Sequence, residues 1–136
     1  MIGILVVCHG NLAEGFKHAV SLIVGERERF SAIGVFEGDP IDDLPRKILA
    51  EVDALDEGDG VLVFVDLLGA SPFNATVKAV SQIEGKKMDM ITGANLPMIL
   101  EAVMHRESGC AIEQLSADVL ETGKNQMHTL TEMMSK

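Results

Sequence analysis

The sequence predicts an α/β fold with an open, mostly parallel sheet and helices on both faces, and three observations support this prediction. Four short apolar runs rich in β-branched residues begin at residues 2, 30, 61 and 88, close to the spacing of about 30 residues in βαβ units. The segments between the runs show the periodicity of amphipathic helices. The first and third runs are almost entirely apolar, as expected of strands buried on both faces of a parallel sheet.

Each apolar run is expected to form one strand. The expected strands cover residues 2–7, 30–36, 61–65 and 88–91. Since crossovers between parallel strands are right-handed, we expect the strand order 2-1-3-4, with a switch point between the first and third strands.

Helices are expected between and after these strands. Two apolar stripes with helical spacing consist of Leu12, Phe16, Ala19, Val20 and Ile23, and of Ile41, Leu44, Ile48, Val52 and Leu55. A third helix is expected to start at Ser71-Pro72, with Ser71 as a capping hydroxyl, and a fourth at Pro97. The region from Cys110 to Lys136 has no single period, so we expect a helix, a short strand and a final helix. All of these segments fit one domain covering residues 1–136.

Composition and charge limit the classes of function. The net charge is −10, and the basic residues form no cluster larger than Lys86-Lys87, which argues against nucleic acid as a ligand. No apolar run approaches the roughly 20 residues that span a bilayer, and no basic residues precede the apolar N-terminal stretch as in a secretory signal. We therefore expect a cytoplasmic protein without membrane insertion. The two cysteines, Cys8 and Cys110, have no metal-ligand spacing, so reduced thiols, no metal and no cofactor are expected.

Polar residues follow the first and third strands, at the edge where open α/β sheets bind ligands. His9 and Gly10 follow the first strand, and Asp66 directly follows the third. Because neighbouring strands are about 4.8 Å apart, we expect Asp66 to reach the His9 ring. A carboxylate bonded to one ring nitrogen fixes the tautomer and leaves the other nitrogen free as a nucleophile.

Two further residues would suit a phosphate beside this histidine. Gly10 permits close approach of the backbone, and Ser71 offers a hydroxyl and free N–H groups at a helix start. Taken singly, each residue could have a purely structural role. His9 could be a hydrogen-bonded histidine at a strand end, Asp66 could cap a turn, and Ser71 could cap a helix. Their convergence on one edge favours a phosphohistidine site.

The same residues could serve a hydrolase or a histidine phosphatase, and the sequence disfavours both. The G-x-S-x-G elbow is absent, and Pro72 cannot supply the N–H that an oxyanion hole takes from the residue after the nucleophile. Histidine phosphatases and mutases need an arginine before the histidine, where this chain has Cys8.

Three separated blocks resemble the mannose-family IIA component (EIIA) of the bacterial phosphoenolpyruvate-dependent sugar phosphotransferase system. They cover residues 4–10, 65–74 and 92–98, and read ILVVCHG, VDLLGASPFN and TGANLPM. Each block falls on an expected junction between a strand and a helix. Two residues depart from the family pattern: Ala70 stands where a second glycine is common, and Cys8 where a small residue precedes the histidine.

The resemblance implies a phosphotransferase component that works through a phosphohistidine. Phospho-HPr would phosphorylate Nε2 of His9, and a IIB protein would receive the group for sugar uptake. Asp66 is implied as the partner of Nδ1, and Ser71 as a contact of the phosphate. A homodimer is also implied, in which an antiparallel edge strand near the C-terminus joins the partner's sheet. Because no Pro/Ala-rich linker ends the chain, the IIB protein is expected to be a separate chain.

Two other functions remain compatible with the sequence. The phosphocarrier subunit of a dihydroxyacetone kinase shares the histidine after the first strand, but its third-strand loop does not resemble residues 71–74. A non-catalytic regulatory domain could instead sense phosphorylation of His9 without passing the group on.

Overall fold

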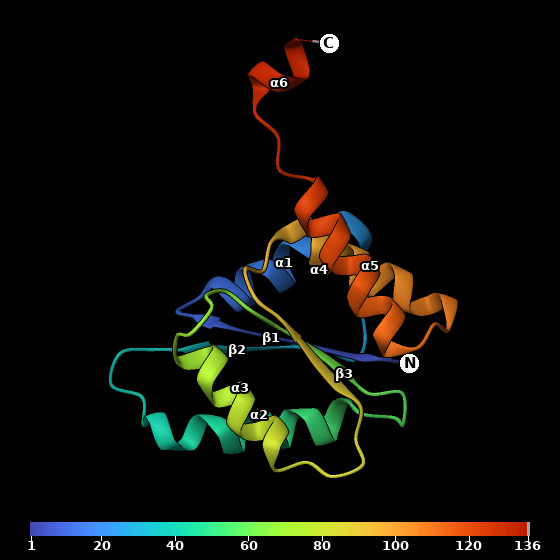
Figure 1. The fold of residues 1–136 in the computed structure, drawn as a ribbon. Helices are drawn as coiled ribbons and strands as arrows, with labels where there is room; N and C mark the ends of the chain where they lie inside the picture. The colour runs from blue at the N-terminus through green and yellow to red at the C-terminus, as the bar shows by residue number, and fades with distance from the viewer. Residues whose placement is uncertain (136) are drawn as a thin grey trace.

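The computed structural model describes residues 1–135 and places four parallel strands in the order β2-β1-β3-β4 (Figure 1). The strands are β1 (Gly3–His9), β2 (Phe30–Val35), β3 (Val61–Val65) and β4 (Met88–Ile91). The expected fold class, strand order and four strands are confirmed, β3 and β4 with the expected bounds. β1 continues past the expected end at residue 7, so that His9 is its last residue.

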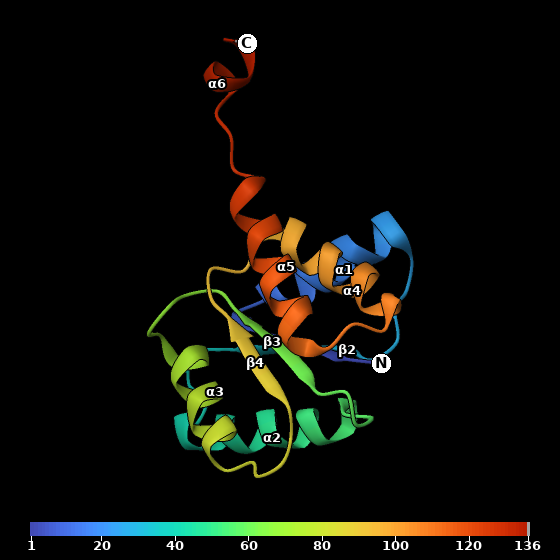
Figure 2. The ribbon, with the colours of Figure 1, turned by 45° about the vertical axis from the view of Figure 1, so that its right-hand side comes forward.

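The helices form two layers, one on each face of the sheet (Figures 1 and 2). One layer contains α1 (Leu12–Val24), α4 (Leu96–His105) and α5 (Ile112–Asn125), and the other α2 (Leu44–Leu55) and α3 (Ser71–Ser81). The 3-10 helices η1 (Ile41–Asp43) and η2 (Arg106–Ser108) precede α2 and follow α4. Among residues 1–135, no helix combines the length and the apolar character needed to cross a bilayer.

The alternation of side chains along β1 divides the core into two halves. Ile4, Val6 and Cys8 belong to the half under α1, α4 and α5, whereas Leu5 and Val7 belong to the half under α2 and α3. All five side chains are fully buried. A buried aliphatic side chain stabilises the fold by about 1.5–3 kcal/mol, so β1 holds His9 at the end of a firmly packed strand.

The expected helical stripes are confirmed for α2 and only partly for α1. In α2 the expected residues from 44 to 55 are buried, but Ile41 is exposed because η1 turns the chain before α2 begins. In α1 the buried residues are Ala13 and Val20, while Leu12 and Ile23 are exposed. The stripe expected for α1 is wrong at both ends, because the helix meets the core through residues 13, 16, 20 and 24.

Two helix starts differ from the expectation. α3 begins at Ser71, but Ala70 occupies the N-cap position and no side chain caps this end in the described residues, so the capping role expected for Ser71 is wrong. α4 begins one residue before Pro97, because the Asn95 side chain accepts the Met98 N–H and caps the helix there.

The C-terminal region, as described to residue 135, forms α5 and a projecting arm, without the expected antiparallel edge strand. This C-terminal arm comprises residues 126–135 and ends in the expected final helix, α6 (Leu130–Met134). Figures 1 and 2 show it leading away from the rest of the molecule. A strand needs a neighbour for its backbone N–H and C=O groups, and within residues 1–135 residues 126–129 pair with no strand.

A buried arginine ties the amino ends of β1 and β2 to the end of α4. The Arg106 guanidinium donates hydrogen bonds to the backbone oxygens of Ile2 (3.0 Å), Arg29 (2.9 Å) and Glu28. Its side chain is almost completely buried, and this burial lowers the pKa of the guanidinium. The contact closes the end of the sheet opposite His9.

Candidate functional site

The candidate site lies at the carboxyl ends of β1 and β3, which are adjacent in the sheet. His9 ends β1, and Asp66 follows Val65, the last residue of β3, which is paired with Val7. Asp66 Oδ2 lies 2.8 Å from His9 Nδ1 and accepts the His9 backbone N–H at 2.9 Å. The structure thus brings His9 and Asp66 into contact through one carboxylate oxygen.

The Asp66 carboxylate receives a third hydrogen bond and stays ionised. The Leu67 backbone N–H donates to Oδ1 at 2.9 Å. Burial raises the pKa of Asp66, but the hydrogen bonds from His9 and Leu67 and the attraction of the His9 ring lower it more, so the pKa lies below its usual value. Asp66 is therefore a negatively charged acceptor at neutral pH.

The two side chains differ in exposure. The Asp66 side chain is 10% exposed and the His9 side chain 47%. Because an ionised carboxylate only accepts hydrogen bonds, its contact assigns the ring proton of neutral His9 to Nδ1. The lone pair of Nε2 is then available on a ring that is open to solvent and to a partner.

Two glycines allow the chain after His9 to lie close to β2. Gly10 has a φ of +57°, a left-handed conformation that favours glycine, and its N–H donates to the Val35 oxygen at 2.8 Å. A Cβ atom at Gly34 would lie 2.5 Å from the Gly10 oxygen. Gly34 is thus a site residue that the sequence reasoning missed, and its only signal was a glycine inside an apolar strand.

Ser71 opens α3 at the same end of the sheet as His9. It lines a small cleft together with Gly34 and Val35, the residues that lie against Gly10. Within residues 1–135 no hydrogen bond links Ser71 to His9. The first N–H groups of a helix lack intrahelical acceptors, so the start of α3 offers an anion a favourable environment at this end of the sheet.

The loop between Asp66 and α3 carries an exposed pair of leucines. Leu67 and Leu68 are 58% and 75% exposed. The loop is braced from α3, because the Asn74 amide donates to the Gly69 oxygen at 3.1 Å. The sequence reasoning gave these leucines no role, yet exposed apolar side chains next to a half-exposed histidine suit contact with another protein.

The thiol of Cys8 is not available as a nucleophile. Its side chain is fully buried in the core under α1, α4 and α5. Burial, together with the charge of Asp66, raises the pKa of the thiol to about 12, so the thiol stays protonated at neutral pH. In the part of the chain that the structure describes, no three histidine, cysteine or carboxylate side chains are grouped as metal ligands.

Comparison with known proteins identifies a matching family and similar sequences. A model of the EIIA-man family, described as "PTS system fructose IIA component", matches residues 3–120. The "PTS system mannose-specific EIIAB component" of Escherichia coli K12 is 33% identical over 129 residues, which are 95% of this chain and 39% of that protein. The chain thus spans well under half the length of that relative. The "PTS system fructose-specific EIIA component" of Bacillus subtilis is 33% identical over 107 residues, 79% of this chain and 72% of that protein.

Solved structures share the fold over nearly the whole chain. The EIIA component of Streptococcus agalactiae has a TM-score of 0.90 and 29% identity, and the match covers 97% of this chain and 99% of that one. A PTS IIA protein associated with the fucose utilization operon of Streptococcus pneumoniae has a TM-score of 0.81 and 27% identity, with 97% and 95% coverage.

Proposed function

The chain belongs to the EIIA-man family, and on this premise we propose that it carries a phosphoryl group of a sugar phosphotransferase system on Nε2 of His9. The observation that carries the proposal is the His9–Asp66 pair, in which Nδ1 is engaged while the ring stays about half exposed. A ring fixed through one nitrogen presents the other as a nucleophile.

The proposed transfer is a displacement at phosphorus. The Nε2 lone pair attacks the phosphorus of a donor phosphohistidine, and a new N–P bond forms as the donor's N–P bond breaks. The electron pair of the broken bond returns to the donor nitrogen. The Nδ1 proton stays on His9, so the phosphorylated ring is a cation beside ionised Asp66, and this opposite charge stabilises it. The same step, with His9 as the donor, passes the group on.

We assign the phosphate contacts to Gly10 and Ser71. Gly10 follows His9 in the sequence and leaves room for phosphate oxygens, because it has no side chain. Ser71 adds a hydroxyl and the N–H groups at the start of α3, 11 residues long, whose dipole favours negative charge at this end.

Two partner proteins follow from this role. Phospho-HPr is the proposed donor and a IIB protein the proposed acceptor, and both must reach the same ring. The exposed side chains of Leu67 and Leu68 offer both partners an apolar contact beside His9.

We further propose that two copies associate through the C-terminal arm. Met127, Leu130, Met133 and Met134 of the arm are 57% to 75% exposed, and β4 is an edge strand of the sheet. An arm that adds an antiparallel strand to another copy would cover both surfaces. Light scattering at micromolar concentration should report about twice the chain mass of 14.6 kDa, and a chain ending at Asn125 should report a monomer. A monomeric parent chain would contradict the dimer.

The phosphoryl-carrier role is tested by transfer in both directions. With phosphoenolpyruvate, enzyme I and HPr, the protein should gain one acid-labile, alkali-stable phosphoryl group, and a His9→Ala variant should gain none. The phosphorylated protein should return the group to unphosphorylated HPr and deliver it to a IIB protein. Full labelling of His9→Ala would refute the assignment, and labelling without onward transfer would favour a regulatory domain.

A further inference from the structure

The third block, TGANLPM at residues 92–98, has no part in the proposed phosphoryl transfer, although it lies at the same end of the sheet. Gly93 has a φ of +69° and turns the chain after β4. The Ala94 N–H then donates to the Val65 oxygen at 3.1 Å, one residue before Asp66. The block is thereby bound to the strand that carries the Asp66 loop.

Asn95 uses both ends of its side-chain amide, each on a different helix. Oδ1 accepts the Met98 N–H at 3.1 Å and caps the start of α4. Nδ2 donates to the Gly123 oxygen at 3.1 Å, in the last turn of α5. Because the last four carbonyls of a helix have no intrahelical partner, this second bond satisfies an orphan acceptor at the end of α5. One side chain therefore caps two helices.

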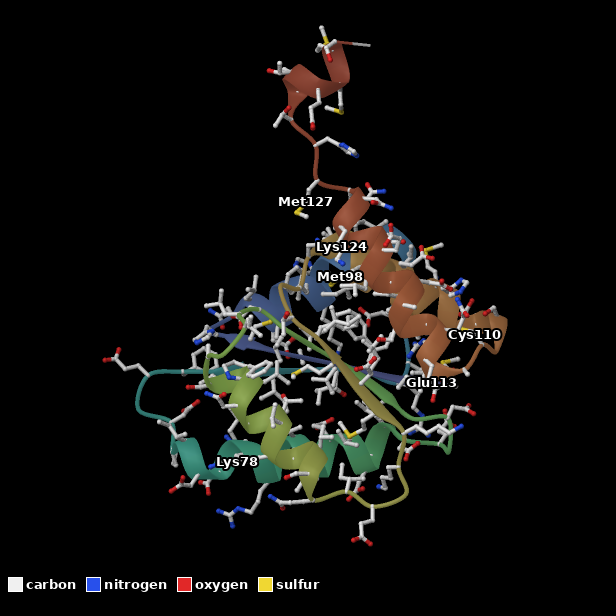
Figure 3. All side chains as sticks on the ribbon, viewed as in Figure 1. Lys78, Met98, Cys110, Glu113, Lys124 and Met127 are labelled. Atoms are coloured by element: carbon white, nitrogen blue, oxygen red, sulfur yellow. The ribbon has the colours of Figure 1, made fainter. Side chains whose placement is uncertain are left out.

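Gly123 is the last buried residue of the described chain. Gly123 is buried, and every residue from 124 to 135 is exposed. A Cβ atom at Gly123 would lie 2.5 Å from Cε of Met98, so α5 approaches α4 as closely as a glycine allows. Figure 3 shows Met98 beside Lys124, where the chain leaves the body of the molecule.

We propose that Asn95 is a positioning residue that anchors the end of α5 and so sets where the C-terminal arm leaves the domain. Its importance for assembly rests on the proposed dimer. The ends of helices fray when their terminal groups lack partners, and without the bond from Nδ2 the last turn of α5 would open and the arm would start from a variable position. Through Ala94 and Val65, the exit of the arm is also fixed relative to the His9 edge.

Asn95→Asp separates the two contacts, because aspartate caps a helix as well as asparagine but has no N–H to donate to Gly123. Hydrogen exchange of the last turn of α5 should become about three- to tenfold faster, as expected for the loss of one hydrogen bond, while exchange of the Met98 amide stays at the parent rate. Asn95→Ala should accelerate both. Gln82→Glu is the control for the added charge, since Gln82 is exposed after α3 and its side chain makes no hydrogen bond within residues 1–135.

The dimer dissociation constant provides a second measurement, which would not change if Asn95 only stabilised the end of α5. Asn95→Asp should raise the dimer dissociation constant about three- to tenfold in sedimentation experiments, without changing the rate of His9 phosphorylation. Gln82→Glu should not raise it. The inference would be overturned if Asn95→Asp exchanged at the parent rates, if Gln82→Glu had an equal effect, or if the dissociation constant of a dimeric protein did not change. If the parent chain is a monomer, the proposed dimer fails, and the exchange rates alone still decide whether Asn95 anchors α5.

Discussion

Replacing Asp66 by asparagine removes one negative charge and tests how the carboxylate serves His9. In the parent protein Oδ2 accepts two N–H groups of His9, and Oδ1 accepts the Leu67 N–H. An asparagine has one oxygen and one NH₂ group, so one end of its amide must face a donor. Turning the NH₂ group toward Leu67 loses the bond from the Leu67 N–H and keeps both bonds from His9. Turning it toward His9 loses the bond from the His9 backbone N–H, and keeps a bond to the ring only if the ring proton moves from Nδ1 to Nε2. We therefore expect the amide oxygen to remain on His9 and the Nδ1–H tautomer to persist.

Asp66→Asn is then expected to slow phosphoryl transfer because the negative charge beside His9 is lost. A hydrogen bond to a charged group contributes about 1.5–3 kcal/mol, and one between neutral groups about 0.5–1.5 kcal/mol. The bond to the ring would thus weaken by roughly 1–1.5 kcal/mol, and the missing charge beside the cationic phosphorylated ring adds an amount of similar size at this half-exposed site. Together these effects raise the barrier by about 2–3 kcal/mol, which slows transfer on the order of 10²-fold.

Single-turnover phosphorylation by phospho-HPr measures this effect directly. Asp59→Asn is the matched control, because it removes the same charge at the amino end of β3, where Asp59 contacts the chain's N-terminal amine. It should transfer at the parent rate. Nitrogen NMR of the His9 ring should show the same tautomer in all three proteins. If Asp66→Asn transfers as fast as the parent, Asp66 is only a turn cap, and the electrostatic role assigned to it is wrong.

Three further predictions concern ionisation, stability and thiol chemistry. The pKa of Asp66 in the folded protein is lowered. The ionised side chain therefore stabilises the fold fully above the unfolded pKa of about 3.9, and this stabilisation is lost as the pH falls through the folded pKa. In urea unfolding, the stability difference between the parent and Asp66→Asn should shrink only below about pH 4. Arg106→Met leaves three backbone oxygens without their donor and should lower the free energy of unfolding by about 2–4 kcal/mol. Arg46→Met changes an exposed side chain and is the control; an equal loss of stability in that variant would contradict this explanation. At pH 7 a thiol reagent should modify half-buried Cys110 and leave Cys8 unmodified, and comparable rates at both would contradict the burial of Cys8.

The His9–Asp66 pair could be predicted because it depends on chain order alone. In a parallel sheet, the residues that end adjacent strands meet at one edge, so recognising the first and third apolar runs placed His9 beside Asp66. The same reasoning placed Ser71 at the start of α3, but its capping role was wrong because Ala70 takes the N-cap position.

Features that depend on tertiary approach or on a second chain could not be predicted in this way. The need for glycine at position 34 comes from the Gly10 oxygen, and Arg106 is buried by the amino ends of β1 and β2, whose carbonyls it bonds. Neither contact leaves a periodic signal in the sequence. The expected edge strand is missing because the arm finds no neighbour within residues 1–135.

The identity of the phosphorylated nitrogen decides whether His9 carries the phosphoryl group as proposed. Phosphorus and nitrogen NMR of the ring-labelled protein, after phosphorylation by phospho-HPr, distinguishes the two ring positions of each histidine. Because Asp66 engages Nδ1 of His9, we predict a single phosphoryl group on Nε2 of His9, which unphosphorylated HPr removes. A phosphoryl group on Nδ1 of His9, or on any other residue, would contradict this prediction.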